Sequence, residues 1–132
     1  MGEVYKARDT RLHRTVAIKT LSQQLSNDTD VKKRFEREAQ AVAALNHPHI
    51  CVLHDVGRHD GMDYIVMEYL EGETLASRLT KGRLPLDQAI TFGIEIAEGL
   101  SKAHRSGVTH RDLKPASSRN PESSCSISDW QN

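Results

Sequence analysis

The segment TVAIKTL, residues 15–21, decides how the first part of this chain is expected to fold. It alternates and is rich in β-branched residues, which predicts a strand that pairs with a second strand over residues 4–7, through a polar turn at residues 9–14. Successive side chains of a strand point to opposite faces, so Ala17 and Lys19 share one face. Lys19 is therefore either an edge lysine whose stem covers apolar surface or a cation that projects into a cleft.

A helix is predicted over residues 30–45, because apolar side chains recur there at helical spacing. Glu38 falls inside that apolar stripe, three residues after Phe35 and four before Val42. A carboxylate on a buried face is costly unless a cation pairs with it. Lys19, on the neighbouring strand, is the candidate partner. The stripe consists of Val31, Phe35, Ala39, Val42 and Leu45.

The middle of the chain predicts two further strands followed by helices. The strands are expected over residues 50–56 and 64–70, joined by the turn residues Asp60-Gly61. A short helix over residues 75–79 and a long helix over residues 87–106 follow. This order of elements is an α+β pattern, in which a mostly antiparallel sheet comes first and helices come after it.

The long helix is expected to begin at the N-cap Asp87 and to stop at Gly107. One face is apolar over so wide an arc that the helix is expected to lie in the core of a larger domain. His104 on that face is expected to be a hydrogen-bonded core histidine rather than a ligand. The face is formed by Ile90, Ile94, Ala97, Leu100 and His104, widened by Gly93 and Ile96.

Composition excludes several classes of function. The chain has 132 residues, with 18 basic and 18 acidic side chains, so zero net charge offers no electrostatic case for nucleic acid or an anionic membrane. No apolar run approaches the roughly 18 residues of a membrane helix. Cys51 and Cys125 are expected to be thiols in a reducing cytoplasm. No metal site is predicted, because the His47-Pro48-His49 run lacks zinc-ligand spacing.

The residues HRDLKP, at positions 110–115, bring an imidazole, a guanidinium, a carboxylate and an amine together before a proline. A solvated surface turn could carry the same charges. The order resembles the catalytic loop of protein kinases, H-R-D-L-x-x-x-N. In that family the aspartate, here Asp112, accepts the proton of the substrate hydroxyl. The lysine two residues later, here Lys114, would neutralise charge on the γ-phosphate.

Two segments near the start of the chain fit the same resemblance. VAIK, residues 16–19, resembles the family strand whose lysine, here Lys19, contacts the α- and β-phosphates of ATP. That lysine pairs with a glutamate of the next helix, which corresponds to Glu38. Gly2 and Val4 resemble the last glycine and the valine of the glycine-rich loop, which implies that Val4 and Ala17 lie against adenine.

The segment MEYL, residues 67–70, resembles the family hinge. The resemblance places Met67 at the gatekeeper position and backbone groups of Glu68 and Leu70 against adenine. The implied fold is a protein-kinase-like fragment. It has a partial N-lobe over residues 1–66, without the first strand, and the hinge, two helices and catalytic loop of the C-lobe over residues 67–115. An aberrant, disordered tail is expected over residues 116–132.

The resemblance implies a bacterial protein serine/threonine kinase, which uses ATP and Mg²⁺ to transfer the γ-phosphate to serine or threonine hydroxyls of a protein substrate. The chain departs from the family pattern after Pro115. Ser117 stands where the family has a magnesium-binding asparagine, and no D-F-G is present. We therefore expect the chain as it stands to be inactive. The alternative is a non-catalytic kinase-like remnant that binds a nucleotide or a protein.

The departure after Pro115 predicts a frameshift in the gene. Residues 123–132, SSCSISDWQN, can be encoded by a DNA sequence whose adjacent frame reads VELLDFGLAK, which resembles the magnesium-loop strand of kinases. Asp129-Trp130-Gln131 as a degenerate D-F-G is the other interpretation. Sequencing the gene should show D-F-G in the adjacent frame, with the shift between residues 115 and 122. An adjacent frame without D-F-G would contradict the frameshift.

Overall fold

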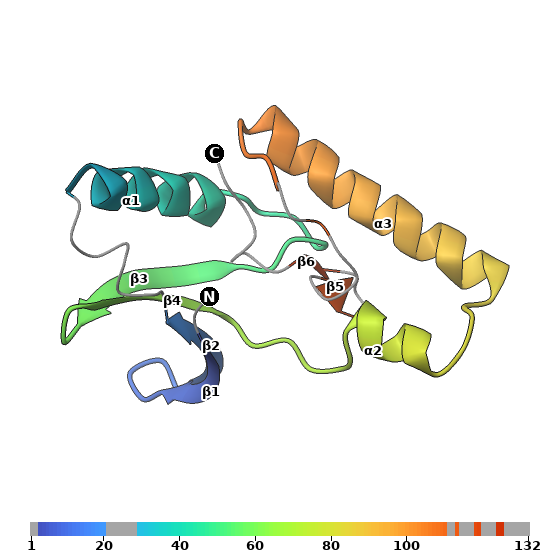
Figure 1. The fold of residues 1–132 in the computed structure, drawn as a ribbon, viewed down its shortest axis with the longest axis horizontal. Helices are drawn as coiled ribbons and strands as arrows, with labels where there is room; N and C mark the ends of the chain where they lie inside the picture. Colours follow the sequence, from blue (N-terminus) through green and yellow to red (C-terminus); the bar gives the residue numbers. More distant parts are fainter. Residues whose placement is uncertain (1–2, 21–28, 111–112, 114–117, 120–123, 126–132) are drawn as a thin grey trace. The chain divides into compact units, whose positions relative to one another are not determined.

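The structure is a computed structural model, drawn in Figure 1. It describes residues 3–20, 29–110, 113, 118–119 and 124–125.

The chain divides into two compact units. The first combines Met1–Ala44 with Val52–Tyr69, and the second combines Leu45–Cys51 with Leu70–Asn132. Along the sequence, the last passage from the first unit to the second falls between residues 69 and 70, three residues beyond the boundary expected after residue 66. The boundary expected at residue 115 stays a prediction.

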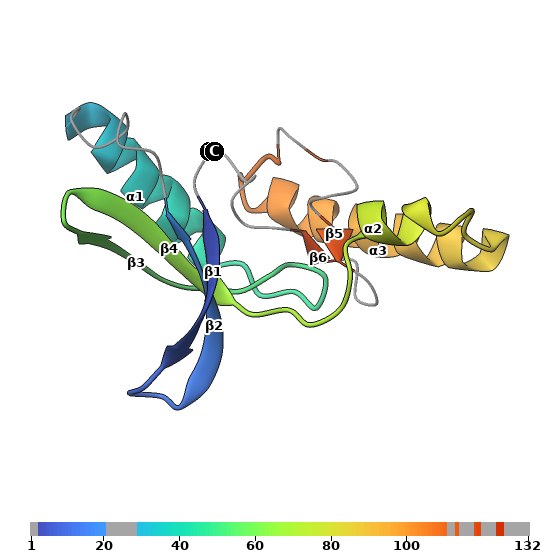
Figure 2. The ribbon, with the colours of Figure 1, turned by 60° about the horizontal axis from the view of Figure 1, so that its bottom comes forward.

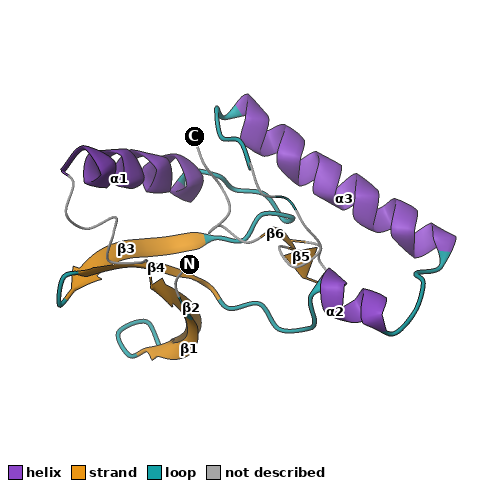
Figure 3. Cartoon of the chain, in the orientation of Figure 1, coloured by secondary structure: helices purple, strands orange, loops and turns teal. Residues whose placement is uncertain are grey.

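The first unit is built on a four-stranded antiparallel sheet, coloured orange in Figure 3. Its strands are β1 (Val4–Asp9), β2 (Arg14–Thr20), β3 (Leu53–His59) and β4 (Met62–Glu68). Their order across the sheet is β1-β2-β4-β3, so β2 pairs with both β1 and β4. The predicted antiparallel sheet is confirmed, and all four strands lie within a few residues of their expected bounds.

Both tight turns of this sheet follow from local chemistry. At the β3–β4 turn Asp60 has φ 50° and Gly61 has φ 75°, as a two-residue hairpin loop with this sequence requires. At the β1–β2 turn the Asp9 carboxylate accepts hydrogen bonds from the backbone N–H groups of Arg11 and Leu12, at 3.0 and 3.2 Å. The Leu12 bond is the largest of the interactions that lower the pKa of Asp9.

The helix α1 (Thr29–Ala43) packs along β3, as Figures 1 and 2 show from two directions. The predicted apolar stripe is confirmed at Ala39, which is 7% exposed, and at Val42, which is 4% exposed. Phe35 and Glu38 on the same stripe are half-buried. The helix therefore covers the sheet with its C-terminal half, and it carries Glu38 at the margin of that buried surface.

The segment Leu45–Cys51 lies between α1 and β3 in the chain but belongs to the second unit. Ile50 and Cys51 are each 3% exposed, and the Ile50 N–H donates to the carbonyl of His47 at 3.1 Å. The strand expected over residues 50–56 is therefore wrong at its start, because β3 begins only at Leu53. The apolar residues that suggested a longer strand are buried in the other unit instead.

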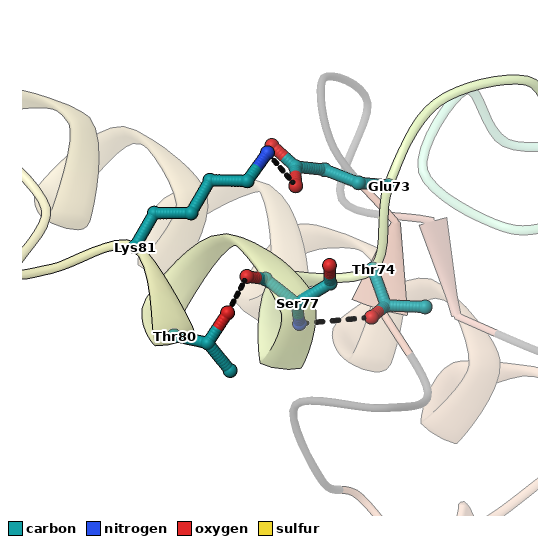
Figure 4. Close-up of polar contacts among 5 residues, drawn as sticks. All are labelled: Glu73, Thr74, Ser77, Thr80 and Lys81. Atoms are coloured by element: carbon teal, nitrogen blue, oxygen red, sulfur yellow. Dashed lines mark hydrogen bonds and ion pairs between the residues drawn. The ribbon is translucent and has the colours of Figure 1, made fainter.

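The helix α2 (Leu75–Thr80) begins the helical part of the second unit. Thr74 caps it by accepting a hydrogen bond from Ser77 N at 3.1 Å, and Thr80 donates to the Ser77 carbonyl at 2.6 Å (Figure 4). Lys81 Nζ lies 2.8 Å from the Glu73 carboxylate, so an ion pair joins the residues that flank this short helix. That hydrogen bond is the main cause that lowers the pKa of Glu73.

The long helix α3 (Leu86–Arg105) starts one residue earlier than expected. Its N-cap is Pro85, which makes no side-chain cap bond, so the prediction of Asp87 as N-cap is wrong. Asp87 lies in the first turn, where a negative charge still interacts favourably with the helix dipole. Gly107, with φ 79°, takes the left-handed conformation expected of a helix stop.

The burial of α3 shows which side of this helix is covered. Gly99 and Ala103 are its buried residues, whereas Ile90 and Ile94 are each 54% exposed. His104 is exposed, so the prediction of a core histidine is wrong. The reason is geometric: Ala103 points into the buried contact, and the next side chain along a helix is turned away by about 100°.

Two short strands of the second unit lie in the part of the chain expected to be a disordered tail. β5 (Ser118–Arg119) and β6 (Ser124–Cys125) pair with each other in antiparallel register. These four residues differ from the expected lack of structure. The other residues of the range 116–132 lie outside the described residues, so the disordered tail stays a prediction for them.

Two glycines of α3 test how closely this helix packs against Leu45–Cys51. A Cβ on Gly99 would lie 3.2 Å from the His49 carbonyl oxygen, whereas a Cβ on Gly93 would have nothing within 4 Å. Gly93→Ala should raise the free energy of unfolding by about 0.5–1 kcal/mol through helix propensity. Gly99→Leu should lower it by about 1–3 kcal/mol through overpacking.

Urea unfolding followed by circular dichroism measures both changes. A Gly99→Leu chain as stable as the Gly93→Ala chain would contradict the contact between α3 and Leu45–Cys51.

Candidate functional site

The register of the sheet brings four of the predicted site residues to one face. Val4 on β1 is paired with Lys19 on β2, and Ala17 on β2 is paired with Met67 on β4. Directly paired residues project to the same side of a sheet, and Ala17 and Lys19 are two residues apart on one strand. We refer to this surface, formed by Val4, Ala17, Lys19 and Met67, as the lysine face.

The lysine face is apolar beside Lys19. Met67 and Ile65, the β4 partners of Ala17 and Lys19, are each 5% exposed. Lys19 itself is half-buried, whereas Val4 at the outer strand is 59% exposed. The face thus offers a flat apolar surface with an ammonium group at one side, a combination that suits a ligand with an aromatic part and an anionic part.

Glu38 is half-buried on α1, within the first unit. Its Oε1 lies 3.5 Å from Nε of Arg34, one helical turn earlier, and the Arg34 side chain is 73% exposed. An exposed pair of this kind contributes little to stability, so it does not hold the carboxylate strongly. The pairing of Glu38 with Lys19 stays a prediction.

The end of β4 is anchored through Glu68 by both its backbone and its side chain. The Glu68 N–H donates to the Val52 carbonyl at 2.8 Å, and the Glu68 carboxylate accepts from the Val52 N–H at 3.2 Å. The sequence offered no signal for this role, because Val52 and Glu68 are 16 residues apart and their contact depends on the sheet register. Leu70, two residues on, is half-buried and begins the second unit.

A second contact at this end of the sheet also gave no signal in the sequence. Nζ of Lys6 lies 4.6 Å from the centroid of the Tyr69 ring, which is a cation–π distance. Lys6 is the β1 partner of Ala17, so it belongs to the same face as the lysine-face residues. A lysine in a short strand and a tyrosine more than 60 positions away give no pattern that sequence periodicity could detect.

The remaining predicted site residues are placed only in part. Gly2, Asp112 and Lys114 lie outside the described residues. His110, which opens the HRDLKP segment, is 3% exposed, and Leu113 is 47% exposed. Among the described residues, no group of three or more His, Cys, Asp and Glu side chains could hold a metal ion. The part of the chain that the structure describes therefore does not provide a magnesium site.

Comparison with known proteins identifies the fold. A profile of the protein kinase domain matches residues 1–117. A probable serine/threonine-protein kinase of Clostridium perfringens is 47% identical over 116 residues, which cover 87% of this chain and 17% of that protein. The serine/threonine-protein kinase PknB of Mycobacterium tuberculosis is 44% identical over 121 residues, which cover 88% of this chain and 19% of that protein. The crystal structure of the Mycobacterium tuberculosis PknI kinase domain matches with a TM-score of 0.80 at 32% identity, over 95% of this chain and 52% of that chain.

The antiparallel sheet, its lysine face and these matches define the class of the molecule as part of a protein kinase domain. The chain belongs to the protein kinase domain family, and its similar relatives are bacterial serine/threonine-protein kinases. It spans 17–20% of the length of these relatives, and about half of the solved kinase domain. The predicted family and the predicted α+β fold are confirmed. Among the described helices, none is both long and apolar enough to cross a membrane.

His54, on β3, gives a test of the electrostatics of the first unit. Burial and, after it, the charge of Arg14 lower the pKa of His54 below its usual 6.5, while Glu68 and Asp9 act in the opposite direction. Between the folded-state pKa and 6.5, the unfolded chain binds more protons, so the free energy of unfolding rises with pH there. We expect stability to fall as pH is lowered from about 7.5 to about 5.5.

Urea unfolding across that range should show a smaller pH dependence for His54→Gln than for the unchanged chain. His104→Gln, at an exposed position on α3, supplies the control variant. An identical slope in the His54→Gln chain would refute the assignment to His54.

Proposed function

We propose that the lysine face forms one wall of an ATP site and that the chain carries the nucleotide-binding part of a protein serine/threonine kinase. The observation that carries this proposal is the sheet register, which aligns Val4 with Lys19 and Ala17 with Met67 on one apolar face. Adenine would pack against Val4, Ala17 and Met67. Lys19, on the same face, would then meet the phosphates.

The end of β4 would bind the edge of the adenine ring. The Glu68 N–H already donates to the Val52 carbonyl, so an adenine contact by Glu68 would use its carbonyl oxygen. Leu70 would offer a second backbone group two residues on. The Glu68–Val52 bonds favour this role, because they hold the backbone of the recognition strand in one position before a ligand arrives.

The charged residues would act on the phosphates and on the substrate. Lys19, held by Glu38, would orient the α- and β-phosphates, and the Gly2 backbone would approach them closely. Asp112 would orient the hydroxyl of a protein serine or threonine and take its proton, while Lys114 would balance charge on the γ-phosphate. The partners of this activity would be ATP and a cytoplasmic protein substrate, with no nucleic acid.

Magnesium chemistry is not supported by the residues at hand. The family uses Mg²⁺ with ATP, but Ser117 replaces the expected asparagine, and no D-F-G occurs in the sequence. Among the described residues, no cluster of His, Cys, Asp and Glu side chains could hold the metal. Charge on the β- and γ-phosphates would thus stay largely uncompensated, so we propose that this chain binds ATP without transferring its phosphate.

The missing metal ligands favour a second candidate function, that of a non-catalytic kinase-like module that binds a nucleotide or a protein. The two candidates share the ATP site and differ in the chemical step. Binding and transfer therefore need separate measurements.

Nucleotide binding can be measured with a methylanthraniloyl derivative of ATP and the 132-residue chain. Lys19→Met should weaken binding about tenfold or more, since a charged hydrogen bond to phosphate is lost. Lys33→Met is the matched control, because it removes the same charge from an exposed position on α1. Equal affinity of the Lys19→Met chain and the unchanged chain would refute the ATP site.

Phosphoryl transfer is tested with radiolabelled ATP and a generic protein substrate. We expect no detectable labelling by the unchanged chain, because the ligands for the metal are missing. Labelling that disappears in the Asp112→Asn variant would show instead that the chain is an active kinase.

A further inference from the structure

Lys6 and Tyr69 form a contact that crosses the strand β2. Lys6 lies on β1 and Tyr69 directly follows β4, while β2 runs between these two strands. Nζ of Lys6 is nevertheless 4.6 Å from the centroid of the Tyr69 ring. Both residues belong to the first unit, so the contact lies within one compact body.

Ala17 explains how the lysine side chain can reach that far. Neighbouring strands lie about 4.8 Å apart, which places β1 and β4 about 10 Å apart across β2. Lys6 is the direct partner of Ala17, whose side chain is a single methyl group, and Ala17 is in turn the partner of Met67. Because Tyr69 comes two residues after Met67, the lysine stem runs diagonally past the small side chain of Ala17, on the side away from Lys19.

Such a contact would restrain β1. It lies at the edge of the sheet, and among the described strands it is paired only with β2. Val4, two residues before Lys6 on the same face, is 59% exposed. An edge strand held along one side alone opens more easily than a central strand. A link from Lys6 to the end of β4 would therefore restrain the strand that carries Val4.

We propose that Lys6 and Tyr69 act as a clasp, by which we mean a cation–π pair that holds β1 toward the end of β4. The clasp would thereby position the lysine face against the bound nucleotide. This inference rests on the proposed ATP site. Lys6 and Tyr69 are positioning residues, because they act through Val4 and through the backbone at Glu68. A cation–π pair whose lysine is exposed, as Lys6 is, changes an equilibrium by about two- to fivefold, which sets the scale of the expected effect.

A double-mutant cycle tests the clasp on the 132-residue chain. Lys6→Met keeps most of the apolar stem and removes the charge, and Tyr69→Leu removes the ring. Each single change should weaken binding of the methylanthraniloyl ATP derivative about two- to fivefold, and the double variant should be no weaker than the weaker single. Lys6→Arg and Tyr69→Phe should keep the affinity of the unchanged chain, since each retains its half of the pair.

Two controls separate the clasp from general effects. Arg11→Met removes the same charge from the adjoining turn, and Tyr5→Leu removes a ring from the opposite face of β1, where its hydroxyl donates to Glu3. Neither should couple to Lys6. The same cycle is also measured by urea unfolding, which needs no nucleotide and should show the same non-additivity between Lys6 and Tyr69.

The outcomes are distinct. Additive effects of Lys6→Met and Tyr69→Leu in both measurements would overturn the clasp. Coupling in unfolding together with unchanged nucleotide affinity would overturn its positioning role. An unchanged chain that binds no ATP derivative would refute the ATP site and, with it, that role, while the unfolding cycle would still show whether the two side chains interact.

Discussion

The antiparallel register of β2 with both of its neighbours is the constraint on which the rest of the site depends. It aligns Val4 with Lys19 and Ala17 with Met67, so residues from three strands share one face. A shift of one residue in either pairing would turn the shifted strand's side chains to the opposite face. The Asp60-Gly61 loop sets a third pairing, that of β3 with β4, because it is a two-residue turn with positive φ at both positions.

Contacts between distant residues then hold the ends of this sheet in place. Glu68 uses its backbone and its carboxylate on the single residue Val52, and Lys6 reaches Tyr69 across β2. Both contacts lie where β4 ends, beside the surface proposed to bind adenine. The lysine face is thus bordered by interactions that limit backbone movement, and such rigidity is what a preformed ligand site requires.

Much of this arrangement could be predicted from periodicity. The strand around Lys19, the helix that carries Glu38 and the Asp-Gly turn all follow from local patterns, and the structure has each of them. The prediction of a core histidine was wrong because of packing. His104 lies on an apolar arc, yet α3 buries the side that carries Gly99 and Ala103. Periodicity shows that a helix has an apolar face, but the neighbouring segment decides which part of it is covered.

The sequence by itself determined the family, the order of strands and helices, and the face on which Lys19 lies, because these depend on motifs and on local alternation. Tertiary structure alone decided that Leu45–Cys51 joins the second unit, that Val52 is bound by Glu68, and that Lys6 meets Tyr69. The physical reason is that each of these contacts joins residues that only the folded chain brings together. Backbone pairing and close packing set them, and neither leaves a mark within a short window of sequence.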